Sequence, residues 1–338
     1  MKKLFKKVAC FTDIHFGMRN NSRMHNDDCE AFIKWFIDEA QARDCETCIF
    51  LGDWHHHRAQ INVSTLNYTI SNLERLSKAF EKVYMIMGNH DLYYREKREI
   101  NSLPFGRIWD NIEIVDEVLK KGDVAIVPWL IENEWKKVVK FKEPYMFGHL
   151  ELGGFKMNAM VEMPDYGGLG MGHFPNQEHV FTGHFHKRQN KLNVHYIGNA
   201  FPHNFADAWD DDRGMMFLEW GGNPEYINWE DCPRYVTTDL STLMDNTEDM
   251  LKSKTHLKVN LDIDITYQEA NQIKEIYLEK YPIREITLLP NTSSEYTENQ
   301  SVEELEFETV DKVVLNQLQC IKSETIKIDK LVSIYNSL

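Results

Sequence analysis

Cysteine and long uncharged apolar runs are scarce in this chain of 338 residues. The six cysteines are scattered too widely for the disulfide framework of a small secreted protein. Cys45 and Cys48 have the spacing of half a zinc ribbon, but no second pair supplies the other half. No stretch approaches the roughly 18 uncharged apolar residues that a membrane-spanning helix needs. We therefore expect a cytoplasmic protein with no membrane association.

Positive charge is also in deficit. The chain carries 38 Lys and Arg against 53 Asp and Glu, a formal net charge of −15. Spread evenly, this charge would repel a polyanion. The acidity disfavours a simple DNA-binding module, and any nucleic-acid substrate would need local clusters of cations.

The first half alternates short apolar runs with helical patterns. Residues 8–11, 48–51 and 83–87 predict strands, and helical spacing of apolar residues precedes the second and third of them. The later of these helices has Ser64 as its expected N-cap. From about residue 112 the predicted strands follow one another more closely, so the sequence predicts a mixed α/β fold with much sheet.

The chain divides into four predicted segments. Residues 1–235 form the main domain, and residues 236–290 a small βαβ-like domain with a strand at 258–263, a helix at 268–280 and a strand at 286–289. Residues 291–310 hold six Glu and no Lys or Arg, which predicts an acidic linker. Residues 311–338 predict two short amphipathic helices.

Five apolar strands end in side chains that bind metals. The five sequences are Asp13-Ile14-His15, Gly52-Asp53, Gly88-Asn89-His90-Asp91, Gly148-His149 and Gly183-His184-Phe185-His186. The loops beyond the carboxyl ends of strands in α/β sheets converge on one crevice, so these residues can meet. On an extended segment, Asp13 and His15 would point to the same side, and His184 and His186 repeat that spacing. Asp91 itself is expected to be a local turn or capping residue.

The ligand types indicate which metals would bind. Carboxylate, imidazole and amide oxygen ligands without thiolate suit Mn²⁺, Mg²⁺, Fe²⁺ or Zn²⁺. Seven candidate ligands are too many for one ordinary ion and suit two ions that share a bridging carboxylate. We expect Asp53 to be that bridge.

The order D-x-H, GD, GNHD, GH, GHxH resembles the signature of the calcineurin-like metallophosphoesterase superfamily over residues 8 to about 200. The resemblance implies a four-layer α/β/β/α sandwich, with a small α/β capping domain and C-terminal helices beside it. It implies that one metal takes Asp13, His15, Asp53 and His186, and the other takes Asp53, Asn89, His149 and His184. His90 resembles the histidine that contacts the scissile phosphate and protonates the leaving oxygen. SbcD-type nucleases of this superfamily have a second phosphate-contacting histidine, and His56, three residues after Asp53, stands at that position. His55 and His57 compete for the assignment.

Further features resemble SbcD-type nucleases of double-strand-break repair and recombination, especially compact phage versions. Residues 52–58 read GDWHHHR, without the Asp-Arg-Gly of the protein phosphatases, and VPW at 127–129, GHLEL at 148–152 and YIGNA at 196–200 extend the likeness. The resemblance implies an exonuclease on duplex ends and an endonuclease on single strands, with two divalent ions, Mn²⁺ before Mg²⁺. It also implies a homodimer whose C-terminal helices dock on an SbcC-type coiled-coil ATPase, in the host cytoplasm for a phage protein.

Local cations agree with a DNA substrate. Arg95, Lys97 and Arg98 follow the GNHD sequence, and Lys187 and Arg188 follow GHFH, so both clusters should flank the metals. Ordinary solvated side chains would give the same pattern. The alternative enzyme is a cytosolic phosphodiesterase or phosphatase for small nucleotides, which would have no need of a docking segment. A scaffold that has lost catalysis would typically have lost metal ligands, and this chain keeps all seven.

Overall fold

The computed structural model describes residues 3–158, 161–165 and 167–290. Its first six-stranded sheet has the order β14-β13-β1-β2-β3-β6, with strands Glu225–Asn228, Gly214–Glu219, Lys7–Phe11, Thr47–Phe50, Lys82–Ile86 and Ile112–Val115. The second has the order β11-β12-β10-β9-β8-β7, with strands Gln189–Lys191, Val194–Tyr196, His179–Gly183, Tyr145–His149, Val124–Val127 and Leu119–Lys121. A separate hairpin pairs β4 (Leu92–Tyr94) with β5 (Lys97–Asn101). The third sheet has three strands, β15 (Arg234–Asp239), β16 (Thr255–Leu261) and β17 (Glu285–Pro290).

The helices are fewer than the strands. The α-helices are α1 (Met18–Asn21), α2 (Arg23–Ala42), α3 (Val63–Ala79), α4 (Trp135–Val138), α5 (Leu240–Asp245), α6 (Thr247–Met250) and α7 (Tyr267–Lys280). Short 3-10 turns cover Pro104–Ile108, Met171–His173 and Phe205–Asp207. None of the helices within the described residues combines the length and the hydropathy that crossing a bilayer requires.

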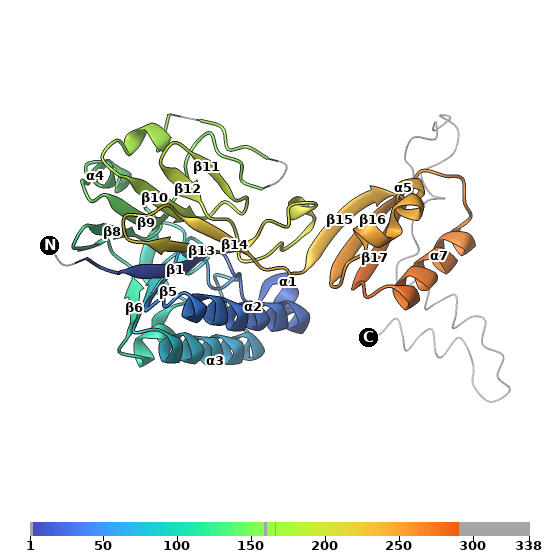
Figure 1. The fold of residues 1–338 in the computed structure, drawn as a ribbon, viewed down its shortest axis with the longest axis horizontal. Helices are drawn as coiled ribbons and strands as arrows, with labels where there is room; N and C mark the ends of the chain where they lie inside the picture. The colour runs from blue at the N-terminus through green and yellow to red at the C-terminus, as the bar shows by residue number, and fades with distance from the viewer. Residues whose placement is uncertain (1–2, 159–160, 166, 291–338) are drawn as a thin grey trace, which may run out of the picture. The chain divides into compact units, whose positions relative to one another are not determined.

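The two large sheets stack face to face, and α2 and α3 cover the outer face of the first sheet (Figure 1). Strand β1 shows how the sequence builds this arrangement. Val8 and Cys10 point into the layer between the sheets, whereas Ala9 and Phe11 point towards the helices. Successive strand residues face opposite sides, so a strand covered on both sides reads as a continuous apolar run.

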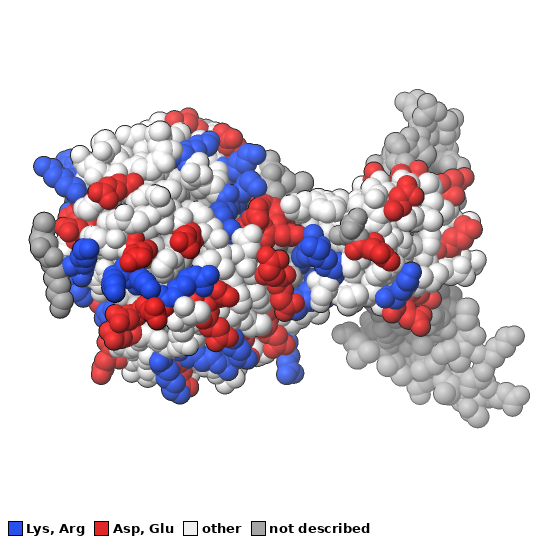
Figure 2. Space-filling model, viewed as in Figure 1, with Lys and Arg blue, Asp and Glu red and all other residues white. Residues whose placement is uncertain are grey.

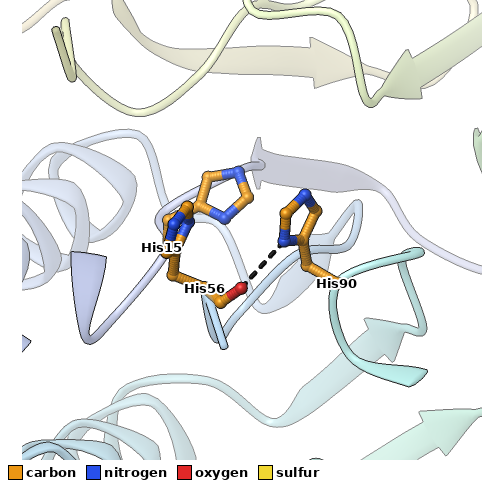
Figure 3. A group of neighbouring side chains, drawn as sticks. All are labelled: His15, His56 and His90. Carbon is orange, nitrogen blue, oxygen red and sulfur yellow. Dashed lines mark hydrogen bonds between the residues drawn. The ribbon is translucent and has the colours of Figure 1, made fainter. Parts of the chain in front are cut away.

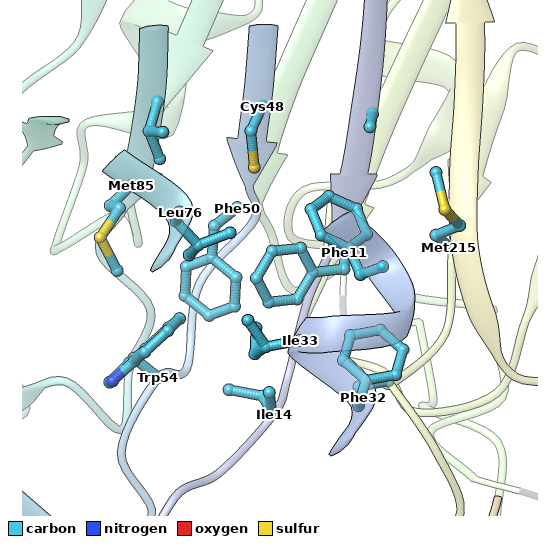
Figure 4. Packing of buried hydrophobic residues seen from close by; sticks show 14 of the residues in the cluster. Phe11, Ile14, Phe32, Ile33, Cys48, Phe50, Trp54, Leu76, Met85 and Met215 are labelled. Atoms are coloured by element: carbon cyan, nitrogen blue, oxygen red, sulfur yellow. The ribbon is translucent and has the colours of Figure 1, made fainter. Parts of the chain in front are cut away.

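Aromatic side chains fill the layer between the first sheet and its helices. Phe11 lies at its centre, with ring centroids 4.5 Å from Phe36 and 4.9 Å from Phe50, and Trp54 closes the layer below them (Figure 4). The outer face of the second sheet is covered by α4 and by loop residues such as Phe155 and Phe174. The α/β/β/α sandwich is therefore confirmed, with a fourth layer that is mostly loop.

The third sheet is a parallel βαβ arrangement with its own core. Helix α7 joins β16 to β17, and residues such as Val236, Leu257 and Ile286 are buried beneath it. The predicted helix at 268–280 is confirmed, and the strand expected at 258–263 begins and ends a few residues earlier. Arg284 joins this sheet to α2 through two hydrogen bonds of 2.6 Å to Asp28.

The expected N-cap of α3 is wrong. The helix begins two residues before the expected start, and Asn62 caps it: its side-chain oxygen accepts the backbone N–H of Ser64 at 2.9 Å. Asn is as good a cap as Ser, and the side chain that precedes the first helical residue takes the role. The predicted linker and C-terminal helices lie outside the described residues, and the division into domains stays a prediction.

Replacing Asn62 with Ala should lower the free energy of unfolding by about 1 kcal/mol, because the first turn of α3 loses its capping oxygen. Ser64→Ala is the matched control and should change it by less than about 0.5 kcal/mol, because Ser64 is exposed and contributes only its backbone N–H. Urea unfolding followed by circular dichroism measures both. An equal loss in the two variants would contradict the assigned cap.

Candidate metal centre

The candidate ligands follow the carboxyl ends of β1, β2, β3, β9 and β10. The first three strands are parallel neighbours in one sheet, and the last two are parallel neighbours in the other. The two sheets stack, so the five loops meet at one edge of the sandwich. All seven candidate side chains come together in two clusters.

The first cluster contains Asp13, His15 and His186, whose ligand atoms lie within 4.8 Å of one another. Oδ2 of Asp13 accepts the hydroxyl of Thr12 at 2.7 Å and the backbone N–H of His184 at 3.0 Å. The other oxygen, Oδ1, is buried without a hydrogen-bond partner in the described residues and lies 3.9 Å from Nε2 of His15. A buried carboxylate oxygen without a partner is costly unless a cation binds it.

The second cluster contains Asp53, His149 and His184, again with ligand atoms within 4.8 Å of one another. The amide oxygen of Asn89 lies between the two imidazoles, 3.0 Å from Nε2 of His149 and 2.9 Å from Nδ1 of His184. Oδ2 of Asp53 lies 3.5 Å from the same nitrogen of His149.

In both imidazoles, the ring nitrogen that points away from Asn89 already forms a hydrogen bond. Nδ1 of His149 donates to the carbonyl oxygen of Leu51 at 2.7 Å, and Nε2 of His184 donates to the carboxylate of Glu151 at 3.1 Å. Each neutral imidazole has one N–H, so the inner nitrogens present lone pairs to the oxygen of Asn89, which can only accept. Acceptors that face one another in a buried space require a proton or a metal ion between them. The residues present therefore fit a divalent metal.

The electrostatics of His149 and Asp53 agree with this fit. Burial by itself lowers the pKa of His149, but the Asp53 carboxylate outweighs it and raises the pKa to about 9. Burial by itself raises the pKa of Asp53, whereas the charge of His149 and its hydrogen bond hold that pKa well below its usual range. The site therefore stabilises positive charge where a metal ion would lie.

Asp53 lies between the two clusters. Its Oδ2 is 3.8 Å from Nε2 of His15 in the first cluster and 3.5 Å from Nε2 of His149 in the second. Its Oδ1 accepts the backbone N–H of His90 at 2.8 Å. One carboxylate oxygen thus faces both clusters, which is the geometry that a bridging ligand needs.

Four of the seven candidate ligands have a left-handed backbone. The φ angles are 49° at Asp13, 52° at His15, 63° at Asp53 and 89° at His184. Such conformations cost about 1–3 kcal/mol each for residues other than glycine, and they concentrate at functional sites. We expected Asp13 and His15 to point to the same side of an extended segment, and this expectation is wrong. The two side chains converge because the chain turns sharply at both positions.

Two buried histidines hold this turn. His203 donates from Nε2 to the carbonyl oxygen of Asp13 at 2.8 Å, and His25 donates from Nε2 to the carbonyl oxygen of His15 at 3.0 Å. Burial, the main cause, lowers the pKa of both imidazoles, to about 4 for His25. Both histidines are therefore neutral at pH 7 and support the ligand loop without adding charge to it.

Two glycines are required by the close approach of the loops. At Gly52, where φ is +105°, a Cβ atom would lie 2.3 Å from Nδ1 of His149. At Gly183 it would lie 2.1 Å from the hydroxyl of Thr12. The glycine that precedes each ligand in these motifs is thus needed for packing as well as for turning.

Asp91 has a larger role than the local turn that the sequence suggested. Its carboxylate accepts the backbone N–H of Gly88 at 2.9 Å, and also those of Asp53 and Trp54 at 3.0 Å and of His55 at 3.2 Å. It is fully buried. Burial, followed by the Asp53 carboxylate, raises the pKa of Asp91 to about 7, and the N–H donors act in the opposite direction. The side chain joins the loops after β2 and β3.

His90 and His56 lie together at the site (Figure 3). Nδ1 of His90 donates to the backbone carbonyl oxygen of His56 at 2.8 Å, and the two rings stack at 5.4 Å. This bond leaves Nε2 of His90 as the nitrogen that can exchange a proton with a substrate. His55 is a structural residue, because its ring nitrogens bond Ser102 and Thr69 at 2.8 Å each.

The candidate DNA-contacting cations divide into two groups. Arg98 pairs with Glu134, Lys187 pairs with Asp210 at 2.8 Å, and the guanidinium of Arg188 lies 5.1 Å over the ring of Tyr226. These three are engaged within the chain. The side chains of Arg95 and Lys97 are exposed and form no ion pair or hydrogen bond with other described residues.

The family model for calcineurin-like phosphoesterases matches residues 6–188, which is more than half of the chain. The chain belongs to this family. It is therefore a metal-dependent phosphoesterase, and the two side-chain clusters could hold divalent ions. Among the described residues, His15, His56 and His90 form a third group whose ligand atoms also lie within 4.8 Å of one another.

Two curated relatives are similar to this calcineurin-like phosphoesterase. Phosphoesterase 244L of Invertebrate iridescent virus 6 is 26% identical over 233 residues, covering 63% of this chain and 75% of that protein. Exonuclease subunit 1 of Enterobacteria phage T4 is 24% identical over 224 residues, covering 63% of this chain and 64% of that protein. A solved structure, the nuclease MPE of Pseudomonas putida, aligns with 63% of this chain and 84% of its own chain, at 18% sequence identity and a TM-score of 0.33.

Asp91→Asn should destabilise the phosphoesterase by about 2 kcal/mol or more, because the amide NH₂ would face backbone N–H donors that lose their acceptor. It should also weaken Mn²⁺ binding, since Asp53 lies in the loop that Asp91 holds. Urea unfolding and isothermal titration with Mn²⁺ measure the two effects. The control is Asp110→Asn, an exposed residue with no interaction among the described residues. Unchanged stability and affinity in Asp91→Asn would contradict the role.

Glu151→Ala should weaken the binding of one Mn²⁺ by about 10–100-fold, because His184 loses the acceptor that fixes its tautomer and ring orientation. Glu151→Gln should lose less, because its amide oxygen can still accept that N–H. Glu117→Gln, at an exposed position, is the control. Titration calorimetry without substrate separates the two sites, and equal affinity in all variants would count against a positioning role for Glu151.

Proposed function

We propose that this phosphoesterase is a DNA nuclease that cuts phosphodiester bonds at a two-metal centre. The observation that carries phosphoester hydrolysis is the convergence of buried acceptors on two neighbouring positions, with Asp53 facing both. The choice of DNA is supported by the likeness to the phage T4 protein named exonuclease subunit 1 and by the free cations Arg95 and Lys97. The sequence GDWHHHR at 52–58 also departs from that of the protein phosphatases.

In this proposal the seven ligands divide between two ions. One ion would be held by Asp13, His15, Asp53 and His186, and the other by Asp53, Asn89, His149 and His184. Mn²⁺ is the expected ion and Mg²⁺ the alternative; two such ions would neutralise charge on the phosphate oxygens and activate water.

His90 and His56 act on the substrate directly. His90 is fixed by its Nδ1 bond to the carbonyl of His56, so its Nε2 can hold a proton and deliver it to the leaving oxygen. The imidazole of His56, stacked on His90, contacts the phosphate. The cut then leaves a 5′-phosphate and a 3′-hydroxyl.

The wider assembly is part of the same proposal. Residues 236–290 form the capping domain, and residues 311–338 dock on an SbcC-type ATPase beyond the acidic linker at 291–310. The enzyme is a homodimer that trims duplex ends and cuts single strands during recombination and double-strand-break repair. The match with the phage T4 protein covers 64% of the length of that protein.

His90→Ala should leave Mn²⁺ binding within about twofold of wild type and lower the rate of DNA cleavage by at least about 100-fold. The reason is that His90 contacts Asp53 through its backbone N–H, which alanine keeps. Titration calorimetry and an end-labelled duplex assay report the two quantities. His173→Ala is the control, because the ring of His173 bonds the backbone of Gly170 and lies against Trp135, and neither is a candidate ligand. Loss of metal together with activity would show that the side chain has a structural role instead.

The substrate class is tested by offering the full chain, with Mn²⁺, an end-labelled linear duplex, a single-stranded oligonucleotide and bis(4-nitrophenyl) phosphate. Metal-dependent shortening of DNA that vanishes in His90→Ala supports the nuclease. Turnover of the small ester with intact DNA, even with a candidate ATPase and ATP present, would favour an enzyme of small nucleotides.

A further inference from the structure

A pair of exposed tyrosines stands on the hairpin that follows the GNHD loop. Tyr93 and Tyr94 have exposed fractions of 45% and 48%, and their ring centroids lie 4.8 Å apart at an interplanar angle of 83°. Neither hydroxyl has a hydrogen-bond partner within the described residues. Two adjacent aromatic rings that are exposed in this way place apolar surface in contact with water and do not stabilise the fold. Such a pair indicates a contact surface.

The hairpin that carries these rings is firmly anchored. At its base, the backbone N–H of Ser102 donates to the carbonyl of Asp91 at 2.8 Å, and Leu92 is fully buried. On β5, Arg98 pairs with Glu134 and donates from Nε to the carbonyl of Trp129 at 3.1 Å. The two rings therefore project from a fixed support.

Free positive charge accompanies the rings. Tyr94 pairs across the hairpin with Lys97, and Arg95 lies between them in the turn. Neither cation has an ion-pair partner in the described part of the chain. On the face seen in Figure 2, basic and acidic side chains are interspersed, and the hairpin likewise carries the exposed Glu96 and Glu99 beside these two cations. A polyanion with flat apolar groups would match this surface.

The turn lies on the rim of the metal centre. Arg98 of β5 donates from Nε to the carbonyl oxygen of Trp129 at 3.1 Å. The ring of Trp129 lies 4.9 Å from that of the candidate ligand His184, between ring centroids. A strand that crosses the metal centre would therefore pass beside the hairpin.

We propose that Tyr93 and Tyr94 form a stacking platform for unpaired nucleobases of a DNA strand, with Arg95 and Lys97 binding its phosphates. This inference rests on the proposed nuclease function and deepens it, because it assigns the substrate as a strand with unpaired bases at the metal centre. Every nucleobase has a flat face, so the platform recognises strandedness without reading sequence. A duplex end would have to fray to use it.

The test compares two labelled oligonucleotides of equal length and charge, one with normal bases and one with abasic sites in its central segment. Binding is followed by fluorescence anisotropy with Mn²⁺, using full-length protein that carries His90→Ala so that the DNA stays intact. The platform should bind the normal strand at least about tenfold more tightly than the abasic strand. Tyr93→Ala with Tyr94→Ala should abolish this preference, and Tyr93→Phe with Tyr94→Phe should keep it. Ile100→Ala, exposed on the same hairpin, should also keep it.

The outcomes separate the platform from the proposed function. Equal binding of both strands by the protein with intact tyrosines, or a preference that survives the double alanine change, overturns the platform while DNA cleavage stands; the rings would then serve a protein partner. Loss of the preference in the double phenylalanine variant also overturns it, because stacking needs no hydroxyl. If the wild-type chain neither binds nor cuts any DNA, the nuclease proposal itself fails.

Discussion

The carboxylate of Asp91 is the constraint on which the geometry of the metal centre depends. It accepts four backbone N–H groups, from Gly88 and from the consecutive residues 53–55, and so fixes the loop after β2 against the loop after β3. Each of these bonds gives a buried backbone N–H its acceptor, and losing that acceptor would cost about 1–3 kcal/mol per group. They can therefore offset the left-handed backbone at Asp53, the residue that faces both clusters. A flexible loop at this point would let the bridging carboxylate turn away.

The fold and the identities of the candidate ligands could be predicted from the sequence because both have local signals. Strands covered on both faces read as short apolar runs, and a glycine before a ligand marks a loop that approaches another closely. The order of five such strand ends resembles one family, and the family match over residues 6–188 agrees with it. The assignment of each ligand to an ion followed from that resemblance. It stays a prediction, and the two clusters agree with it.

The supporting interactions could not be predicted, because they join residues that only the stacked sheets bring together. Glu151 lies 33 positions from His184, and His203 lies 190 positions from Asp13. Nothing in the local sequence of either residue marks it as a partner. The sharp turns at Asp13 and His15 were missed for a related reason: a left-handed residue other than glycine is stabilised by distant groups, here His203 and His25.

Three of the five cations that were expected to contact DNA interact within the chain instead, which affects how an acidic protein could bind DNA. Arg98, Lys187 and Arg188 stood out in the sequence as DNA contacts, yet the fold commits each to a partner of its own. With these three cations engaged and a net charge of −15, we expect the salt dependence of DNA binding to be shallow. Affinity must then come from contacts that salt does not screen. Base stacking of the kind proposed for Tyr93 and Tyr94 would be such a contact, and it would make the charge deficit of the chain compatible with the proposed nuclease.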